Sequence, residues 1–398
     1  MPTESPPILE PLFTRRFGWL FAAHFLQAFG FGSLFLLPLF LEHIGATKLE
    51  IGSIMAVQGV GALVVRPLVA WSLDNLGRKT TLYAGTALIT LGLVMVAFIE
   101  DTGPYAYVSR VVFGMGTGAL FPGYFAFASD IIPASRRTEG IAIFGLGGLL
   151  PLAFNPLIPR LGIDAAGLSG FFPIIGLVVA CSVFFLIPIA ETPLQKNTDG
   201  TSFWRSLKHL TKPAVWPVWF ATIVFAGMLA VFASFVTVLA NQRGVSDPTA
   251  IWFTYAAGAA CVRLLGAKLP DRVGPSNMVT PSVAFYVIGI VVVAQATTTE
   301  QFMIGGLLTG LGHGYCFPVL TAQVINRVPT QIRGSGLAFS TGLFELSGLT
   351  LTPLFGAFAD STSLPAMFLL VALSATIGTM GWFWLESRWG NTGRGKPN

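Results

Sequence analysis

Charged residues are scarce in this sequence. Only 10% of its 398 residues are Asp, Glu, Lys or Arg, whereas a soluble domain carries about 25%. Hydrophobic residues make up 53% of the chain, and the mean hydropathy is +0.72. Such a chain is not built to fold in water, so the composition excludes an ordinary soluble globular protein.

Cysteine and histidine are also rare. Cys181, Cys261 and Cys316 lie far apart, each inside an apolar segment, so we expect neither a disulfide framework nor a metal cluster. The chain has only four histidines and no H-E-x-x-H zinc motif. The sequence therefore predicts no bound metal and no cofactor.

Motifs for ATP binding and enzyme chemistry are absent as well. The chain contains no G-x-x-x-x-G-K-[ST] phosphate loop and no C-x-x-C pair, and its 45 glycines are spread through apolar segments. These absences exclude a self-contained ATP-driven pump, and we expect no enzymatic activity. A polytopic membrane enzyme or sensor is a more distant alternative. It would need a polar catalytic cluster or an appended soluble domain, and no loop is long enough for one.

Long apolar runs take the place of the missing polar surface. Most of them contain 20 or more residues, which is enough to cross a hydrocarbon core of about 30 Å. We predict an all-α integral membrane protein with twelve transmembrane helices. The predicted spans are 17–41, 50–71, 80–99, 104–128, 139–159, 167–189, 214–239, 249–268, 277–296, 301–323, 335–357 and 364–385.

Lysines and arginines in the loops lie mostly on the side of the N-terminus. Seventeen lie on that side, and only Lys48, Arg160 and Arg243 lie on the other. The positive-inside rule therefore predicts a multi-pass protein of the cytoplasmic (inner) membrane with both termini in the cytoplasm. This distribution also accounts for the net charge of +5, so we expect contact with the lipid bilayer and no nucleic-acid partner.

The sequence repeats at an offset of about 196 residues. Seven residues between Gly114 and Gly140 recur 196 positions later, between Gly310 and Gly336. Three loop residues recur 197 positions later: Arg66 as Arg263, Asp74 as Asp271 and Gly77 as Gly274. Paired six-helix halves with a binding site between them are a transporter architecture. The predicted parts are an N-terminal six-helix bundle in 1–190, a cytoplasmic linker in 191–213 and a C-terminal six-helix bundle in 214–398.

Two stretches resemble the motifs of a known family. The loop from Ala70 to Leu82 is similar to the signature G-x-L-a-D-r-x-G-r-k-x-x-l of the major facilitator superfamily, although Ala70 and Ser72 depart from it. The stretch from Arg110 to Gly118 is similar to the R-x-x-x-G-x-G motif of that superfamily's fourth helix. The resemblance covers the whole chain and implies a monomeric transporter with two pseudo-symmetric six-helix bundles and a small-molecule substrate.

Further residues resemble one branch of that superfamily. Arg66-Pro67 and the Phe-Glu-Leu-Ser stretch at Glu345 are similar to bacterial drug and metabolite exporters of the arabinose-efflux type. The stretch from Gly145 to Pro151 lacks the G-P-x-x-G-G signature of drug/proton antiporters. The resemblance implies alternating access coupled to protons. Our first hypothesis is export of a small organic molecule by proton antiport, and the alternative is proton-coupled uptake of a small organic anion.

Ionisable side chains inside the spans are candidates for function, because each costs several kcal/mol in hydrocarbon. Glu345 lies near the middle of the eleventh span, where desolvation disfavours its charged form. It is the first candidate for proton coupling and His313 is the second, with purely structural roles as the alternative for both. We expect the substrate cavity to be lined by His24, Gln27, Arg110, His313 and Glu345. For Arg110, a structural salt bridge is an equally good interpretation.

Charged loop residues are candidates for a cytoplasmic gate. We expect Asp74 and Asp271 to form ion pairs with nearby arginines that close the cytoplasmic side in one conformation, since several weak pairs together bias a two-state equilibrium. Arg66 and Arg263 fit a gate or a snorkelling role better than substrate binding. The predicted gate consists of Arg66, Asp74, Gly77, Arg78, Lys79, Arg137, Arg263, Asp271, Arg272 and Arg333.

Overall fold

The computed structural model describes residues 11–133, 136–191, 209–266, 269–329 and 332–390, and every regular element in these ranges is a helix. The elements are α1 (Arg15–Ser33), η1 (Leu34–Leu36), α2 (Leu37–His43), α3 (Lys48–Ala56), α4 (Gln58–Asn75), α5 (Arg78–Val96), α6 (Pro104–Ile131), α7 (Arg137–Gly147), η3 (Leu150–Phe154), α8 (Leu157–Arg160), α9 (Leu168–Leu186), η4 (Pro213–Val215), α11 (Trp216–Gln242), α12 (Ile251–Leu265), α13 (Leu269–Val273), α14 (Pro275–Gln295), α15 (Thr299–Arg327), α16 (Arg333–Ser361) and α17 (Leu364–Trp389).

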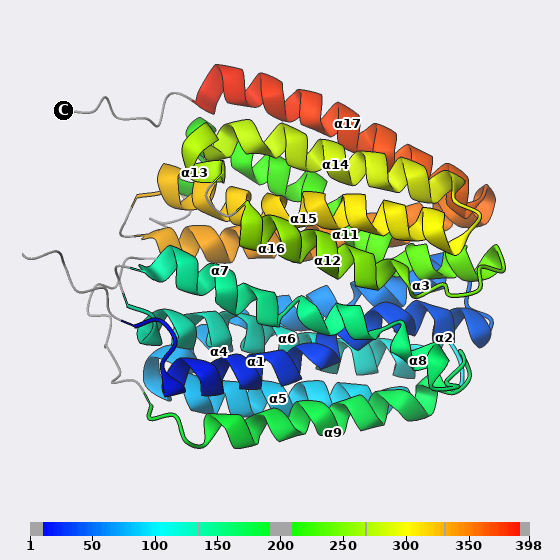
Figure 1. Ribbon diagram of the computed structural model, residues 1–398, viewed down its shortest axis with the longest axis horizontal. Coiled ribbons are helices and arrows are strands. Elements are labelled where there is room, and N and C mark those ends of the chain that lie inside the picture. The colour runs from blue at the N-terminus through cyan, green and yellow to red at the C-terminus, as the bar shows by residue number, and fades with distance from the viewer. Residues whose placement is uncertain (1–10, 134–135, 192–208, 267–268, 330–331, 391–398) are drawn as a thin grey trace, which may run out of the picture.

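The helices run side by side along one direction (Figure 1). Within the described ranges, ten helical segments are long and apolar enough to cross a membrane, and Ile251–Leu265 is a shorter apolar helix. The segment 137–160, built from α7, η3 and α8, completes the twelve expected passes. The all-α membrane fold is therefore confirmed. The predicted linker 191–213 lies mostly outside the described residues.

The fifth pass is not the continuous helix that the sequence predicted. It breaks after Gly147, continues as the short helix η3 and ends in α8. Pro151 and Pro156 have no backbone N–H to donate to a helical carbonyl, which explains the breaks. Asn155 links this irregular segment to the first pass, because its side-chain amide donates to the carbonyl of Gly32 on α1 at 3.0 Å.

The second pass breaks at a place that the sequence did not indicate. The break is at Val57, between α3 and α4, and α4 then continues through Pro67 to Asn75. The turn before α5 is therefore shorter than the predicted loop. It depends on Gly77, whose φ of 97° favours glycine, and the repeat-related Gly274 has a φ of 94° at the start of α14.

The two halves use the same close packing between helices. A Cβ added to Gly114 on α6 would overlap the carbonyl oxygen of Gln58 on α4. At the repeat-related Gly310 on α15, it would overlap the carbonyl oxygen of Tyr255 on α12. Gln58 and Tyr255 are themselves 197 positions apart. Small residues let helix backbones approach closely in membranes, and here they do so at equivalent points.

Contacts between the halves are made by a few elements. Helix α16 packs against α3 and α4, α12 packs against α7 and η3, and α11 packs against α2. Helix α1 begins and α17 ends at the same end of the molecule, on the left in Figure 1. We call it the basic end, because Arg78, Lys79, Arg327 and Arg333 lie there, and the other is the opposite end.

Candidate functional site

The two halves meet closely at the opposite end. The carboxylate of Asp360, at the end of α16, accepts hydrogen bonds from the backbone N–H groups of Lys48 and Leu49, both at 2.8 Å. The first N–H groups of a helix have no partner within it, so a residue of the second half completes α3. A Cβ on Gly52 would lie 2.6 Å from the carbonyl oxygen of Thr352, so this approach requires glycine.

Three more polar contacts between side chains cross the interface at this end. Glu42 accepts hydrogen bonds from the side-chain amides of Asn241 and Gln242, at 3.2 and 2.7 Å. Arg160 Nη2 lies 3.6 Å from Asp247 Oδ2. Sequence reasoning did not single out any of these residues. Their contacts close the opposite end by direct links between the halves.

Two repeat-related arginines cross the interface nearer the basic end. Arg66 on α4 donates to the carbonyl of Ala338 and to the hydroxyl of Thr341 on α16, both at 2.7 Å. Arg263 on α12 donates to the carbonyl of Gly145 on α7 at 3.3 Å. Gly145 lies 196 positions before Thr341. The two contacts are therefore equivalent under the repeat.

Glu345 lies one helical turn beyond Thr341 on α16. Its side chain is half-buried and faces α4, since a Cβ added to Gly59 would lie 3.4 Å from Glu345 Oε2. The guanidinium of Arg66 attracts this carboxylate. The structure thus places Glu345 where the two halves meet.

His313 on α15 is held by Tyr255 on α12, because the Tyr255 hydroxyl and His313 Nδ1 share a hydrogen bond. Phe225 lies edge-on to the imidazole, with ring centroids 5.5 Å apart. Phe225 also contacts Phe344, the neighbour of Glu345, at 5.9 Å. A series of rings therefore leads from His313 to the residue beside Glu345. The sequence contained no signal for Tyr255, which is one tyrosine among many apolar neighbours.

His24 on α1 is buried among aromatic rings of the first half. Its ring stacks on Phe144 with centroids 4.6 Å apart, and Tyr124 lies at 5.1 Å. Neither ring nitrogen of His24 makes a hydrogen bond of full geometry in the described part of the chain, although Gln27 lies close enough to interact with the imidazole. Gly148 leaves room for the imidazole, since an added Cβ would lie 3.2 Å from His24 Nε2. Gln27, one turn along α1, is also buried.

Arg110 is buried between α6 and the junction of α3 with α4. Its Nη2 donates to Gln58 Oε1 at 2.6 Å, and its guanidinium approaches the carbonyl oxygens of Ile54 and Met55 at 3.4 Å. These carbonyls belong to the last turn of α3, where helical donors are missing. The guanidinium also lies over the ring of Phe113 at 5.1 Å. These contacts stabilise the junction at Val57, where the helix of the second pass is interrupted.

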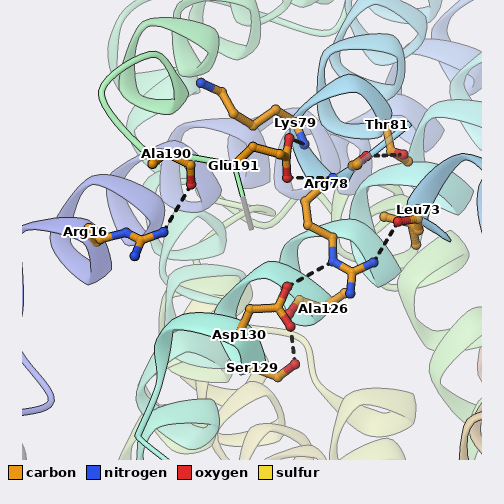
Figure 2. Close-up of polar contacts among 11 residues, drawn as sticks. Arg16, Leu73, Arg78, Lys79, Thr81, Ala126, Ser129, Asp130, Ala190 and Glu191 are labelled. Atoms are coloured by element: carbon orange, nitrogen blue, oxygen red, sulfur yellow. Dashed lines mark hydrogen bonds and ion pairs between the residues drawn. The ribbon is translucent and has the colours of Figure 1, made fainter. Parts of the chain in front are cut away.

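The signature loop is bound to the ends of α6 and α9 (Figure 2). Glu191 accepts hydrogen bonds from the backbone N–H groups of Arg78 and Lys79, both at 2.9 Å. Arg78 Nε pairs with Asp130 Oδ2 at 3.0 Å, and Arg78 Nη1 donates to the carbonyl of Leu73 at 2.9 Å. All these groups belong to the first half, so the loop ties helices of one half together.

The carboxylate that pairs with Arg78 is Asp130 and not the expected Asp74. Asp74 is exposed in the last turn of α4, and among the described contacts none involves its side chain. Asp130 and Glu191 were missed by sequence reasoning. Both are acidic residues at the ends of the fourth and sixth spans, on the side of the basic loops. This placement could have indicated that they pair with the loop.

The other predicted gate residues are Arg137 of the first half and Asp271, Arg272 and Arg333 of the second half. The side chains of Arg137 and Asp271 lie outside what the structure describes. Arg272 is exposed, and Arg333 Nε donates to the carbonyl of Ile325 at 3.1 Å. The Arg333 contact lies within one half, as do those of Arg78. Of the predicted gate, only Arg66 and Arg263 therefore have described hydrogen bonds to the other half.

This architecture defines a class of protein. Membrane-crossing helices in two repeated sets, with ionisable groups where the sets meet, are the arrangement of a secondary transporter. The family model of the Major Facilitator Superfamily matches residues 20–299 and 218–397. The chain belongs to the Major Facilitator Superfamily. It is a multi-pass inner-membrane transporter of a small molecule, and not an enzyme.

Several bacterial proteins are similar in sequence. The uncharacterised MFS-type transporter STM4428 of Salmonella typhimurium is 24% identical over 369 residues, covering 90% of this chain and 93% of the relative. The multidrug resistance protein MdtG of Serratia proteamaculans is 23% identical, covering 88% and 89%. The gentisate transporter of Corynebacterium glutamicum is 24% identical, covering 71% and 67%. Relatives named for multidrug resistance and for gentisate transport are thus similar in sequence to this chain.

Solved structures agree with the fold. A bacterial homologue of the human lysosomal transporter Spinster, in an inward-facing and unoccupied conformation, matches with a TM-score of 0.77 at 13% identity, covering 98% of this chain and 100% of that one. The nucleoside transporter NupG matches with a TM-score of 0.76 at 13% identity, covering 94% and 99%. At this identity the likeness concerns the fold alone.

Proposed function

We propose that this protein exports a small organic molecule across the inner membrane by alternating access, in exchange for protons carried by Glu345. The observation that carries the proposal is the place of Glu345 beside Gly59, where α16 of one half meets α4 of the other. A carboxylate at such a boundary changes its surroundings whenever the halves move. Protonation is thereby linked to the conformational change.

The chemistry of the exchange follows from Arg66. While α4 and α16 are in contact, the guanidinium of Arg66 stabilises the charged form of Glu345. Separation of these helices removes the charged partner and changes the surroundings of Glu345, so the balance between its charged and protonated forms changes as well. A substrate that favours one arrangement of α4 and α16 then competes with a proton that favours the other arrangement. This competition is what a proton antiporter requires.

The orientation of the chain is part of the proposal. The basic end faces the cytoplasm, as the positive-inside rule expects. The opposite end, where Asp360 joins the two halves through hydrogen bonds to α3, then faces outward. In a variant without Cys181, Cys261 and Cys316, a cysteine at Asn277 should react with impermeant reagent only from the cytoplasm, and one at Gly244 only from outside. The reverse pattern would overturn the orientation.

The relatives support export, because MdtG is named as a multidrug resistance protein. One observation favours a second candidate, which is uptake of a small organic anion together with protons. Arg66 and Arg263 bring two positive charges to the part of the interface where Glu345 lies, and the described carboxylate near Arg66 is that of Glu345. A relative is named as a gentisate transporter, and gentisate is such an anion.

The test of the proposed function uses Glu345→Gln, which keeps shape and hydrogen bonding but cannot cycle a proton. An untargeted comparison of the medium of cells with and without the gene first identifies an exported compound. Proteoliposomes of the parent should then concentrate this compound under a proton gradient, whereas the Gln variant should only exchange it for itself. Glu300→Gln, an exposed carboxylate at the start of α15, is the matched control. If Glu345→Gln still transports against a gradient, Glu345 is not the coupling group.

A further inference from the structure

The two repeat-related arginines, Arg66 and Arg263, differ in their hydrogen bonds and in the charges near them. Arg66 makes two hydrogen bonds of 2.7 Å across the interface and attracts the carboxylate of Glu345. Arg263 makes one hydrogen bond of 3.3 Å to Gly145, and its buried Nε has no hydrogen-bond partner in the described part of the chain. Arg66 therefore has a carboxylate of the other half nearby and two short hydrogen bonds, whereas Arg263 has one long hydrogen bond.

The reason for the difference can be read from the repeat. The residue 196 positions before Glu345 is Leu149, so the second arm has no carboxylate at the equivalent position. None of the ion pairs among the described side chains involves either arginine. Arg66 nevertheless has the carboxylate of Glu345 nearby, whereas Arg263 has the hydroxyl of Tyr255. A half-buried guanidinium within the membrane costs free energy unless an anion pairs with it. That anion is missing from the described residues around Arg263.

The surroundings of Arg263 fit an aromatic ligand. Gly145 has no side chain, and an added Cβ there would lie 3.2 Å from Arg263 Nη1 and 3.9 Å from the ring of Phe125. Phe125 contacts the His24 imidazole edge-on, with ring centroids 6.0 Å apart. Gln27 lies close enough to interact with one His24 nitrogen, and the other has no partner among the described residues. The guanidinium of Arg263, the ring of Phe125 and the imidazole of His24 therefore lie next to one another across the interface.

We propose that Arg263 binds the carboxylate of an aromatic carboxylic acid, whose ring packs against Phe125, and that His24 hydrogen-bonds a polar substituent of that ring. The inference names the substrate class of the proposed transporter and rests on that function. It fits both directions of transport. The anion is held at the contact of α12 with α7, whereas the proton is held at the separate contact of α16 with α4.

Binding can be measured without a proton gradient, so this test is independent of the proposed coupling. The purified protein in lipid nanodiscs is titrated with benzoate, which replaces chloride mole for mole, and its thermal midpoint is recorded. Benzamide, the neutral isostere, is the control ligand. Benzoate should raise the midpoint of the parent and of Glu345→Gln, and benzamide should not. Equal effects of benzoate and benzamide, or none beyond those of chloride, would overturn the proposal.

The variants locate the site. Arg263→Gln should weaken benzoate binding about tenfold or more, because it removes a charge-assisted hydrogen bond. Arg263→Lys keeps the charge but not the planar guanidinium, so its affinity for benzoate should lie between those of the parent and of Arg263→Gln. This variant still tests the site if the Gln variant does not fold. Arg243→Gln, at the opposite end, should bind as the parent does. Unchanged benzoate affinity in Arg263→Lys and Arg263→Gln would show that Arg263 only holds the two halves together.

Discussion

Phe121 and Phe317 meet edge to face across the boundary between the halves, with ring centroids 6.1 Å apart and ring planes at 89°. They are separated by 196 positions and occupy the same place in the two repeats. Each precedes a proline inside a long helix, α6 in one case and α15 in the other. Their contact marks the line about which the two repeats are arranged.

The first prediction concerns this pair. Phe121→Leu and Phe317→Leu should each lower the thermal stability by similar amounts, since the two positions are equivalent. The double variant should lose less than the sum, with a coupling free energy of about 0.5–1.5 kcal/mol for an aromatic pair. A double-mutant cycle of thermal midpoints in nanodiscs measures it. Purely additive effects would mean that the rings do not interact in the membrane.

The second prediction separates the two acids near Arg78. Asp130→Asn should lower the stability by about 1 kcal/mol, because Asp130 pairs with Arg78 in this conformation. Asp74→Asn should leave stability unchanged, because Asp74 is exposed here, yet should abolish transport if Asp74 pairs only when the basic end closes. Arg78→Ala should lower the thermal stability and also abolish transport. Transport and thermal midpoints are compared for the three variants, and full transport by Asp74→Asn would remove Asp74 from the gate.

The third prediction concerns the hydrogen bonds that Asp360 accepts from the start of α3 at the opposite end. Asp360→Ala removes both hydrogen bonds to the start of α3 and should destabilise the closed state by about 2–3 kcal/mol. A cysteine introduced at the buried Thr352 should then react with a thiol reagent at least about tenfold faster. Ser361→Ala is the control, because that hydroxyl bonds only within its own helix. Equal labelling rates in both variants would show that Asp360 does not hold this end closed.

The fourth prediction decides the role of Arg110. Arg110→Lys should lower the unfolding free energy by about 2–3 kcal/mol, because a lysine cannot serve both Gln58 and the carbonyls at the end of α3. Gln58→Leu should be similarly destabilising. Thermal midpoints and substrate affinity are measured together. If stability is kept while affinity is lost, Arg110 lines the substrate path and the structural interpretation fails.

What the sequence determined by itself were features that depend on local chemistry. Long apolar runs specify membrane spans wherever they fold, because hydrocarbon accepts only segments whose backbone groups are satisfied internally. Gly77 and Gly274 mark their turns because a positive φ is unfavourable for other residues. The repeat and the superfamily motifs were visible for the same reason, since each is a pattern of residue types along one stretch of chain.

The tertiary structure decided which groups meet. The break at Val57 has no local signal, because the donors for the free carbonyls of α3 come from Arg110 on another helix. Asp130 rather than Asp74 pairs with Arg78 because only the packing of α6 beside the loop brings a carboxylate within 3.0 Å. Asp360 completes a helix that lies more than 300 positions earlier in the sequence. Such choices depend on distances across the interface between the halves, and a linear pattern of residues does not contain those distances.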